Sequence, residues 1–558
     1  MPARRKPAFR PLSESPLWAA NRSYYERTGI DAWRTATVPH YVTNNVPLAA
    51  AYARIVFAFL NENRSAEKGL DENGHSRRTR LRRARRAGGL GGRPEPPMYI
   101  VELGAGCGRF AFLFLRAFEA LERGARDAPL SIRYVMTDVT SSTIAFWRAH
   151  EALAPFVRAG RLDFARFDAE TDGALRLQHA RQTIGPDARV ARVVVIANYV
   201  FDGLRHDAFV VRDGRLHEYL ATTDVPRRRG AAADVALQWR EGARVRAPYA
   251  EADFNAILAE YGRNAGAGRT VFPVGALRCL DRLATLAHDD LLVLAADRGT
   301  AEATDALMRP ADLEMARHGS VSLPVNFHAL RSWVTRRGGR ALTPSQEHRH
   351  LYITGFLLGT PTNDWRATSL AYREAIGDGG PDELYTFRRG LTAIADQLGA
   401  AELVALIRLC GHDPRVVAEC IRPLWRHVVD ANARLRLEIR DIALAAWASY
   451  YHVGEPYDLA FNLALLLYET RAFTDAHALF DESVRLYGDD GATRWNLGLC
   501  QVALGKPDEA MASFHRAREL APDLLPAGLK LVKVRDLLLS SAARDSGGRR
   551  RRPRAPRR

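Results

Sequence analysis

The sequence predicts an α/β protein in which a doubly wound, mostly parallel sheet is followed by an all-α helical domain. Three observations predict this fold class. Apolar strand-like segments alternate with helical patterns from Met98 to about Gly359, a glycine-rich turn follows the first strand, and the pattern is helical throughout from about Pro381. Alternation of strands and helices favours a parallel sheet covered by helices on both faces.

The chain of 558 residues is long enough for about three domains. Its hydrophobic content of 47% supports a sizeable core. Neither an apolar run of about 18 residues nor a secretory signal is present, so we expect no membrane span. The five cysteines are scattered and form no CxxC pair, so a reducing cytoplasm is expected rather than a disulfide framework or zinc site.

The net charge of +16 is concentrated in low-complexity segments. The first ten residues, the stretch 77–93 and the tail 549–558 are rich in arginine and contain no acidic residue. The rest of the chain is therefore close to neutral, so no basic folded face is indicated. We interpret these arms as solvated, with binding to nucleic acid or another polyanion as the less favoured alternative.

The elements expected before the α/β domain and within it follow from hydrophobic periodicity. A helix is expected at Pro47–Asn61, and a hairpin turning at Asp213-Gly214 is expected at Ala208–Leu220. The expected strands are Met98–Leu103, Ser131–Thr137, Arg161–Phe167, Val190–Ala197 and Asp290–Ala296. The expected parts of the chain are an N-terminal lead with its helix (1–62), a flexible Arg/Gly-rich insertion (63–97), the α/β domain (98–360), the helical domain (381–540) and a disordered Arg-rich tail (541–558).

The first expected strand ends in a glycine loop, ELGAGCG, that contains Glu102, Gly104, Gly106 and Gly108. Glycines allow a tight strand-to-helix turn and let a ligand lie against bare backbone, as we expect at Gly106. Arg109 stands where the dinucleotide motif GxGxxG needs its last glycine, and no Walker motif is present. The loop resembles that of class I methyltransferases, and this resemblance implies S-adenosyl-L-methionine as the cofactor.

Polar residues recur at the ends of successive strands. From Glu102, intervals of 36, 30 and 30 residues lead to Asp138, Asp168 and Asn198. Each interval is one strand-helix unit, so these side chains should meet at the carboxyl edge of the sheet, where ligands bind. Asp138 is expected to accept both ribose hydroxyls, and Asp168 the adenine amino group, with Phe167 packing on the ring. The alternative is that the aspartates merely cap the following helices.

The segment after the fourth strand is the expected acceptor side. Asn198 and Asp202 are the candidate catalytic residues, because methyl transfer needs a positioned acceptor and, for an amine or hydroxyl, a proton sink. Tyr199, His206 and Asp297 are further candidates, although each is at least as well explained as a structural loop residue. The histidines show no ligand spacing, so no metal site is expected.

The same region resembles the MidA family of arginine methyltransferases linked to assembly of respiratory complex I. The resemblance covers roughly residues 20–355 and implies protein-arginine methylation. Tyr199 replaces a glutamate of that family, and His206 falls near its expected proline, so the substrate is the least supported part of the resemblance. The matching elements are Tyr24-Tyr25, Gly29, Thr43, Ala197-Asn198, Asp202-Gly203-Leu204, Arg215–Glu218, Leu291–Gly299 and Val325-Asn326-Phe327.

An internal repeat with an offset of 34 residues lies near the C-terminus, relating Asp458–Gly488 to Ala492–Pro522. It resembles the tetratricopeptide pattern, in which small residues let paired helices approach and a phenylalanine fills the space against the next repeat. Stacked repeats suit peptide binding, so a protein or peptide partner is expected there; an intramolecular cap or a dimer contact is the alternative. The paired positions are Asn462/Asn496, Leu463/Leu497, Ala464/Gly498, Ala476/Ala510 and Phe480/Phe514.

These observations predict a methyltransferase that modifies a protein side chain docked by the helical domain. Two alternatives stay open: a small-molecule methyltransferase whose repeats serve oligomerisation, and an inactive interaction scaffold. The intact loop and Asp138 favour an active donor site.

Overall fold

The computed structural model describes residues 8–522 except 36, 39, 68–96, 126–128, 189, 225–235, 265–266, 303–306, 308–315, 318–319, 345–350 and 360–363. The chain divides into two units, Met1–Tyr385 and Thr386–Arg558. The Arg-rich arms expected at 77–93 and 549–558 lie outside the described residues, as do residues 523–540 of the expected helical domain.

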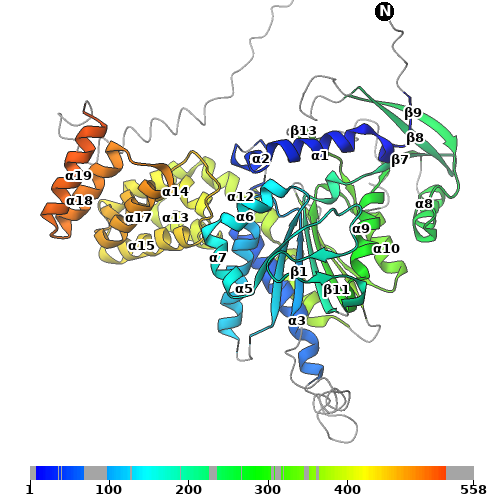
Figure 1. Cartoon of the computed structure of the whole chain (residues 1–558), viewed down its shortest axis with the longest axis horizontal. Helices are drawn as coiled ribbons and strands as arrows, with labels where there is room; N and C mark the ends of the chain where they lie inside the picture. The colour runs from blue at the N-terminus through cyan, green and yellow to red at the C-terminus, as the bar shows by residue number, and fades with distance from the viewer. Residues whose placement is uncertain are drawn as a thin grey trace, which may run out of the picture. The chain divides into compact units, whose positions relative to one another are not determined.

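The first unit is built on a seven-stranded sheet with the order β16-β17-β11-β6-β1-β2-β3. Two of its strands, β1 and β11, are labelled in Figure 1. The five strands from β3 to β11 are parallel, whereas β17 runs antiparallel to β11 and to β16. All five expected strands are confirmed. The strands are β1 (Met98–Leu103), β2 (Ile132–Asp138), β3 (Leu162–Arg166), β6 (Val190–Asn198), β11 (Ala287–Asp297), β16 (Arg340–Leu342) and β17 (Tyr352–Leu358).

The direction of chain winding reverses between β1 and β6. The chain runs outward from β1 through β2 to β3, and then returns to pair β6 with the other edge of β1. Leu103 pairs with Ala197, and Ala296 pairs with Asn198, so three strands end at nearly the same level. A reversal of this kind opens a crevice at the carboxyl ends of the strands, which is where open α/β sheets bind ligands.

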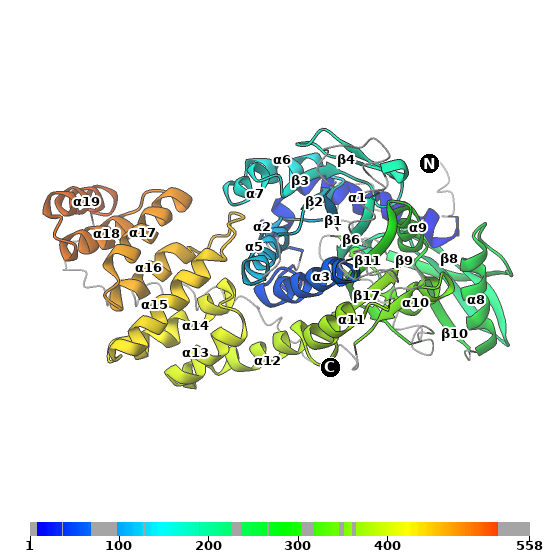
Figure 2. The ribbon, with the colours of Figure 1, turned by 90° about the horizontal axis from the view of Figure 1, so that it is seen from below.

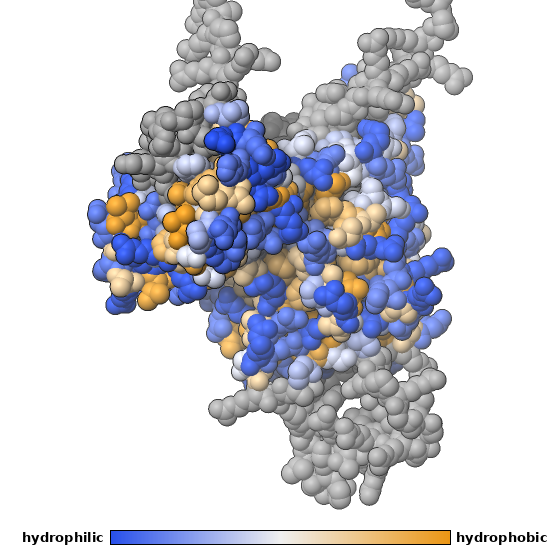
Figure 3. Space-filling model, turned by 60° about the vertical axis from the view of Figure 1, so that its left-hand side comes forward, coloured by the Kyte–Doolittle hydropathy of each residue, from blue (hydrophilic) through white to orange (hydrophobic). Residues whose placement is uncertain are grey.

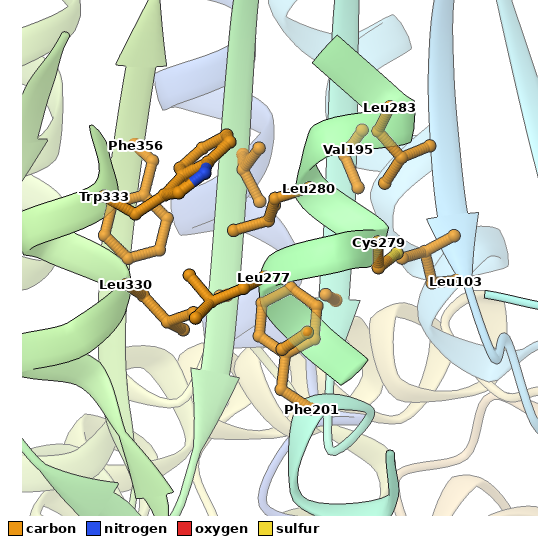
Figure 4. Close-up of a cluster of buried hydrophobic side chains, with 14 of the residues drawn as sticks. Leu103, Val195, Phe201, Leu277, Cys279, Leu280, Leu283, Leu330, Trp333 and Phe356 are labelled. Carbon is orange, nitrogen blue, oxygen red and sulfur yellow. The ribbon is translucent and has the colours of Figure 1, made fainter. Parts of the chain in front are cut away.

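Helices cover both faces of this sheet (Figure 2). On one face, α5 (Arg109–Gly124) and α11 (Arg366–Tyr372) pack against α3 (Val46–Glu67), and the Phe114 ring lies 5.3 Å from that of Tyr134 on β2. On the other face lie α9 (Val274–Ala284) and α10 (Phe327–Arg336), as Figure 4 shows. Leu277, Leu280, Trp333 and Val195 are buried in this layer, each contributing about 1.5–3 kcal/mol by burial.

The N-terminal lead is more structured than the sequence predicted. It forms the short helix η1 (Leu12–Glu14), then α1 (Pro16–Thr28) and α2 (Asp31–Arg34). The expected helix at Pro47–Asn61 is present as α3, but it continues to Glu67, into the segment expected to be flexible. The sequence from 62 to 67 contains no glycine or proline, so nothing in it stops the helix.

A second, antiparallel sheet with the order β10-β7-β8-β9 follows β6 in the chain. The expected hairpin is β7 (Asp207–Arg212) and β8 (Arg215–Asp224), and both Asp213 and Gly214 have positive φ (49° and 66°), as a type I′ turn requires. The other strands of this sheet are β9 (Ala236–Arg244) and β10 (Gly268–Phe272).

Short elements complete the first unit. They are α6 (Ser141–Ala149), η2 (Glu151–Leu153), α7 (Ala154–Arg158), β4 (Leu175–Arg176), β5 (Thr183–Ile184), η3 (Pro186–Ala188), η4 (Phe201–Gly203), α8 (Ala252–Asn264), β12 (Gly299–Thr300), β13 (Ala316–Arg317), β14 (Val321–Ser322), β15 (Val325–Asn326) and η7 (Arg373–Gly377).

The second unit is helical over its described residues, as the sequence predicted, and none of the described helices is long and apolar enough to cross a membrane. Hydrophobic and hydrophilic residues are interspersed over the visible surface (Figure 3). The helices are α12 (Pro381–Ala393, which begins in the first unit), η8 (Ala395–Gln397), α13 (Ala400–Leu409), α14 (Pro414–Val428), α15 (Ala433–Ala448), α16 (Leu459–Glu469), α17 (Phe473–Tyr487), α18 (Gly491–Ala503) and α19 (Pro507–Leu520).

The small residue and the phenylalanine of each repeat have a defined packing role. A Cβ added at Gly498 would lie 2.6 Å from the Phe514 ring, so α18 and α19 approach closely only because residue 498 is glycine. Phe514 also packs on Trp495, with ring centroids 4.8 Å apart, and Phe480 packs on Phe461 at 5.6 Å. Each phenylalanine therefore contacts the first helix of its own repeat, whereas the sequence predicted only a contact with the next repeat.

Candidate methyl-donor site

A cavity of about 750 Å³ lies at the carboxyl ends of β1, β2 and β6. This size is within the range of small-molecule and cofactor pockets. The expected site residues that line it are Glu102, Gly104, Gly106, Asp138, Phe167, Asp168, Asn198 and Asp202. Gly108 does not line it; with φ 85° directly before α5, this glycine serves the turn rather than the ligand.

The glycine loop has the left-handed backbone that only glycine adopts without strain, with φ of 56° at Gly104 and 54° at Gly106. A Cβ at Gly106 would lie 3.1 Å from the indole ring of Trp33 on α2. In this structure Trp33 therefore occupies the space that a side chain at residue 106 would take, while Gly106 itself lines the cavity. That a ligand lies against Gly106 stays a prediction. The sequence offered no reason to place a distant tryptophan on the loop.

Glu102 ends β1 in a buried position, 4% exposed. The Tyr134 hydroxyl donates to its Oε2 at 3.0 Å. Burial raises the pKa of Glu102 to about 8, because the charged form loses its hydration, and the Tyr134 hydrogen bond offsets only part of this. At neutral pH this carboxyl group therefore keeps its proton when the cavity holds no ligand.

Asp138 ends β2, and its Oδ1 accepts a hydrogen bond from the Thr140 amide at 2.8 Å. Burial raises the pKa of Asp138 to about 6, although the Thr140 hydrogen bonds lower it. Phe167 is buried beside it, and its amide donates to the Asp138 carbonyl at 3.1 Å. The hydrogen bond from Thr140 is the kind of capping interaction expected if Asp138 only capped the following helix. Asp138 also lines the cavity, so capping is not its only contact.

Asp168 is held by a cation that the sequence did not point to. Arg22 Nη1 of α1 donates to Asp168 Oδ2 at 2.5 Å, and the Glu170 amide donates to Asp168 Oδ1 at 2.9 Å. Burial would raise the pKa of Asp168, but the Glu170 amide and Arg22 together bring it below its usual value. Asp168 therefore stays ionised and remains a hydrogen-bond acceptor at the cavity wall.

Asn198 ends β6 and carries a buried polar atom without a partner. The hydroxyl of Tyr52 on α3 donates to Asn198 Oδ1 at 3.0 Å. Asn198 Nδ2 has no hydrogen-bond partner among the described residues. An unsatisfied buried amide costs about 1–3 kcal/mol, so this group is suited to a ligand that accepts a hydrogen bond.

Asp202 lines the cavity from η4 and is 8% exposed. Burial raises its pKa to about 6, against the lowering effect of a hydrogen bond from Ser322. Asp297, at the end of β11, is fully buried beside it, and the Phe201 amide donates to Asp297 Oδ2 at 3.2 Å. The two aspartates, which are far apart in the sequence, thus form one acidic pair.

The other acceptor-side candidates differ in position. Tyr199 lines the cavity and has a positive φ of 52°. His206 does not line it: its ring stacks on Trp18 with centroids 5.9 Å apart, and its Nδ1 lies 2.8 Å from the Leu204 carbonyl. Burial lowers the pKa of His206 to about 4. His206 is therefore a packed, neutral residue rather than a proton acceptor for a ligand.

The N-terminal lead supplies a wall of the cavity that sequence reasoning missed. The lead is fastened by the Asn21 side chain, which donates to the Val321 carbonyl at 3.1 Å and accepts from the Val321 amide at 3.0 Å. The Tyr25 hydroxyl also donates to Ser320 at 3.0 Å. The earlier signals in the lead were the family-like Tyr24-Tyr25 pair, Gly29 and Thr43. The lining residues from the lead include Trp18, Asn21, Arg22, Tyr25, Trp33, His40 and Asn44.

The comparisons with known proteins point to one chemistry. Residues 89–340 match a family model described as "Putative S-adenosyl-L-methionine-dependent methyltransferase". The matched segment, which is less than half of the chain, is similar to this family. It contains the glycine loop, the strand-end residues and the acidic pair. No curated protein matches the chain at a significant level.

Two crystal structures from Burkholderia thailandensis are similar to part of this chain. One, of an uncharacterized superfamily protein, has 14% sequence identity and a TM-score of 0.39, covering 65% of this chain and 90% of that one. The other belongs to the same superfamily and holds S-adenosyl-homocysteine; it has 15% identity and a TM-score of 0.38, covering 64% and 90%.

The cofactor of the methyltransferase segment is S-adenosyl-L-methionine. The cavity residues fit this molecule by their chemistry. Asp138 and Glu102 supply oxygen acceptors for hydroxyl or ammonium groups, Phe167 an apolar ring for adenine, and Asn198 an unpartnered donor for a carboxylate. Among the described residues, no group of three or more metal-ligating side chains is found.

Proposed function

We propose that this protein transfers a methyl group from S-adenosyl-L-methionine to a protein side chain, with arginine as the candidate acceptor. One observation carries the proposal. A single cavity contains the expected donor residues Glu102 and Asp138 together with the expected acceptor-side residues Asn198 and Asp202. Donor and acceptor held in one cavity gain the rate advantage of proximity and orientation.

When bound, the cofactor supplies an electrophilic methyl group on a sulfonium. In our proposal Asp138 holds the ribose, and Phe167 with Asp168 holds the adenine. Asn198 and Asp202 face the acceptor, and Asp202 takes the proton that the acceptor atom releases. An acidic wall favours a cationic acceptor such as a guanidinium or ammonium group, which is why a basic protein side chain fits better than a neutral one.

The helical unit has the second role in this proposal, that of docking the substrate protein. Its four last described helices form two pairs related by the 34-residue repeat, and the close approach at Gly498 supports a tetratricopeptide-type packing. Such stacks bind extended peptides. We expect the protein to act in the cytoplasm.

The experiment has two steps. Calorimetry with S-adenosyl-homocysteine tests the donor site in the full chain, with Asp138→Ala as the control that removes the expected ribose acceptor. Cell extract incubated with the protein and tritiated S-adenosyl-L-methionine then shows the class of acceptor. Label in a protein, released as methylated arginine on hydrolysis, supports the proposal. Label only in small molecules or nucleic acid contradicts it, and donor binding without label in any fraction favours the scaffold alternative.

A further inference from the structure

The acidic pair beneath the acceptor side contains a residue with no direct access to the cavity. Asp202 lines the cavity, whereas Asp297 is fully buried and does not. Asp297 Oδ2 accepts from the Phe201 amide at 3.2 Å, and Phe201 directly precedes Asp202. Asp297 Oδ1 has no hydrogen-bond partner of good geometry among the described residues. The fold therefore holds a second carboxyl group directly behind the one that faces the acceptor.

The two carboxyl groups have different environments. The backbone of η4 is fixed by the Leu323 amide, which donates to the Asp202 carbonyl at 3.1 Å. Burial raises the pKa of Asp202, but hydrogen bonds from the side chains of Ser322 and Asp297 and the nearby charge of Arg298 lower it, so its anion is partly stabilised. Asp297 has only backbone amides to stabilise its anion, and burial together with the charge of Asp202 raises its pKa well above the usual range. Two adjacent buried carboxylates cannot both ionise easily, so the less stabilised one keeps its proton.

We propose that Asp297 is a positioning residue that stays protonated behind Asp202 and keeps Asp202 ionised as the proton acceptor. This inference rests on the proposed function. In the transfer step, the acceptor atom forms a bond to the methyl carbon while the carbon–sulfur bond breaks and its electron pair stays on sulfur. The proton that the acceptor loses passes to the Asp202 carboxylate, and Asp297 keeps its own proton throughout.

The remaining ionisable groups around the pair do not replace Asp297 in this role. Tyr52 is buried and the other two tyrosines are half-buried, and desolvation raises the pKa of each above its ordinary value, so they stay neutral. Arg298 is exposed and acts on Asp202 only through its charge. The groups concerned are Tyr25, Tyr52, Tyr199 and Arg298.

The location of the proton can be measured in the ligand-free full chain without a known acceptor. Aspartate labelled with ¹³C at its side-chain carboxyl reports protonated groups in infrared or NMR spectra between pH 5 and 9. We expect a protonated aspartate signal in the wild type at pH 8 that is absent from Asp297→Asn. In Asp202→Asn the signal should persist but disappear at a lower pH, because the neighbouring charge has been removed. A wild type without this signal, or an Asp297→Asn protein that retains it, overturns the proposal.

The kinetic arm uses tritium incorporation into extract protein as a function of pH. Asparagine at 297 is neutral and can still donate a hydrogen bond to Asp202. The rate of tritium incorporation by Asp297→Asn should therefore stay within about threefold of the wild-type rate at pH 8. Asp297→Ala cannot donate a hydrogen bond to Asp202. The acidic limb of its pH–activity profile should therefore move to higher pH by on the order of one unit. Equal losses in both variants at every pH would show a merely structural role. Calorimetry with S-adenosyl-homocysteine on the same samples distinguishes the role of Asp297 from the proposed function. If donor binding is unchanged but Asp297 does not hold the proton, this inference alone is refuted. If the wild type does not bind the donor, the proposed function is refuted.

Discussion

Arg22 of the N-terminal lead forms an ion pair with Asp168 at the end of β3, with Nη1 and Oδ2 2.5 Å apart. Arg22 is 41% and Asp168 15% exposed in their side chains, so the pair lies at the rim of the donor cavity. The contact joins the lead to the residue that we expect to bind the adenine amino group, and it keeps that residue ionised. The lead is therefore part of the wall of the cavity.

We expect substitution of Asp168 to weaken donor binding more than substitution of Arg22. Asp168→Ala should weaken S-adenosyl-homocysteine binding by about 5- to 100-fold, which corresponds to the loss of about 1–3 kcal/mol for a hydrogen bond to a charged group. Arg22→Ala should weaken it less, by about fivefold or under, because a partly exposed ion pair contributes about 1 kcal/mol at most. Calorimetry gives both values. A larger effect from Arg22→Ala than from Asp168→Ala would mean that the arginine itself contacts the donor.

Donor binding should depend on pH through Asp138. Its pKa is raised to about 6, and only the ionised carboxylate accepts both ribose hydroxyls. The affinity for S-adenosyl-homocysteine is therefore expected to be constant above about pH 7 and to fall as the pH drops through 6. Asp138→Asn should bind more weakly at pH 8 and lose most of this pH dependence. Titrations at pH 5 to 8 check this, and a variant with the same slope as the wild type would assign the dependence to another group.

Glu102 should make the ligand-free protein less stable at alkaline pH. Its pKa is about 8 in the folded state, whereas the ordinary value is 4.5. The folded state thus retains a proton that the unfolded state releases above pH 4.5. This contribution to stability is full below pH 4.5 and is lost, by up to about 1.4 kcal/mol per pH unit, as the pH rises towards 8. Urea unfolding should show Glu102→Gln to be more stable than the wild type at pH 8, and the difference should shrink towards pH 5.

The two glycines Gly498 and Gly390 provide a matched test of the helical unit. Gly498→Ala places a Cβ 2.6 Å from the Phe514 ring, so the helices must separate, at a cost of about 1–3 kcal/mol. Gly390 lies in α12 with nothing within 4 Å of an added Cβ, so Gly390→Ala should be neutral or slightly stabilising. Thermal unfolding followed by circular dichroism compares them. Equal melting temperatures in the two variants would contradict the packing described for α18 and α19.

A chain ending at Tyr385, the last residue of the first unit, tests the docking role of the helical unit. It retains α11, whose first amides are capped by Glu62. Provided that it is monodisperse, it should keep donor binding and lose methylation of the natural protein target, mainly through a higher KM, because remote docking raises the effective substrate concentration. Equally efficient methylation by this shorter chain would favour a capping or dimerisation role.

Much of the cavity lining could be predicted from the sequence alone. The strands have local apolar patterns, and the glycine loop is contiguous in the chain. Glu102, Asp138, Asp168 and Asn198 each follow a strand, and parallel topology brings strand ends to one edge whatever the details of the helices. The two helical repeats were equally local, since their signal is a periodic match within the chain.

Only the tertiary structure decided what covers the site and which groups are ionised. Arg22 and Asp168 are 146 residues apart, and Phe201 and Asp297 are 96 apart. No pattern along the chain relates such residues, because their contact depends on how the lead and the end of β11 pack onto the sheet. Burial is likewise a property of the packed state, and it is burial that separates the neutral Glu102 and Asp297 from the ionised Asp168. The sequence thus determined which chemical groups reach the carboxyl edge, and the packing determined their charges and their partners.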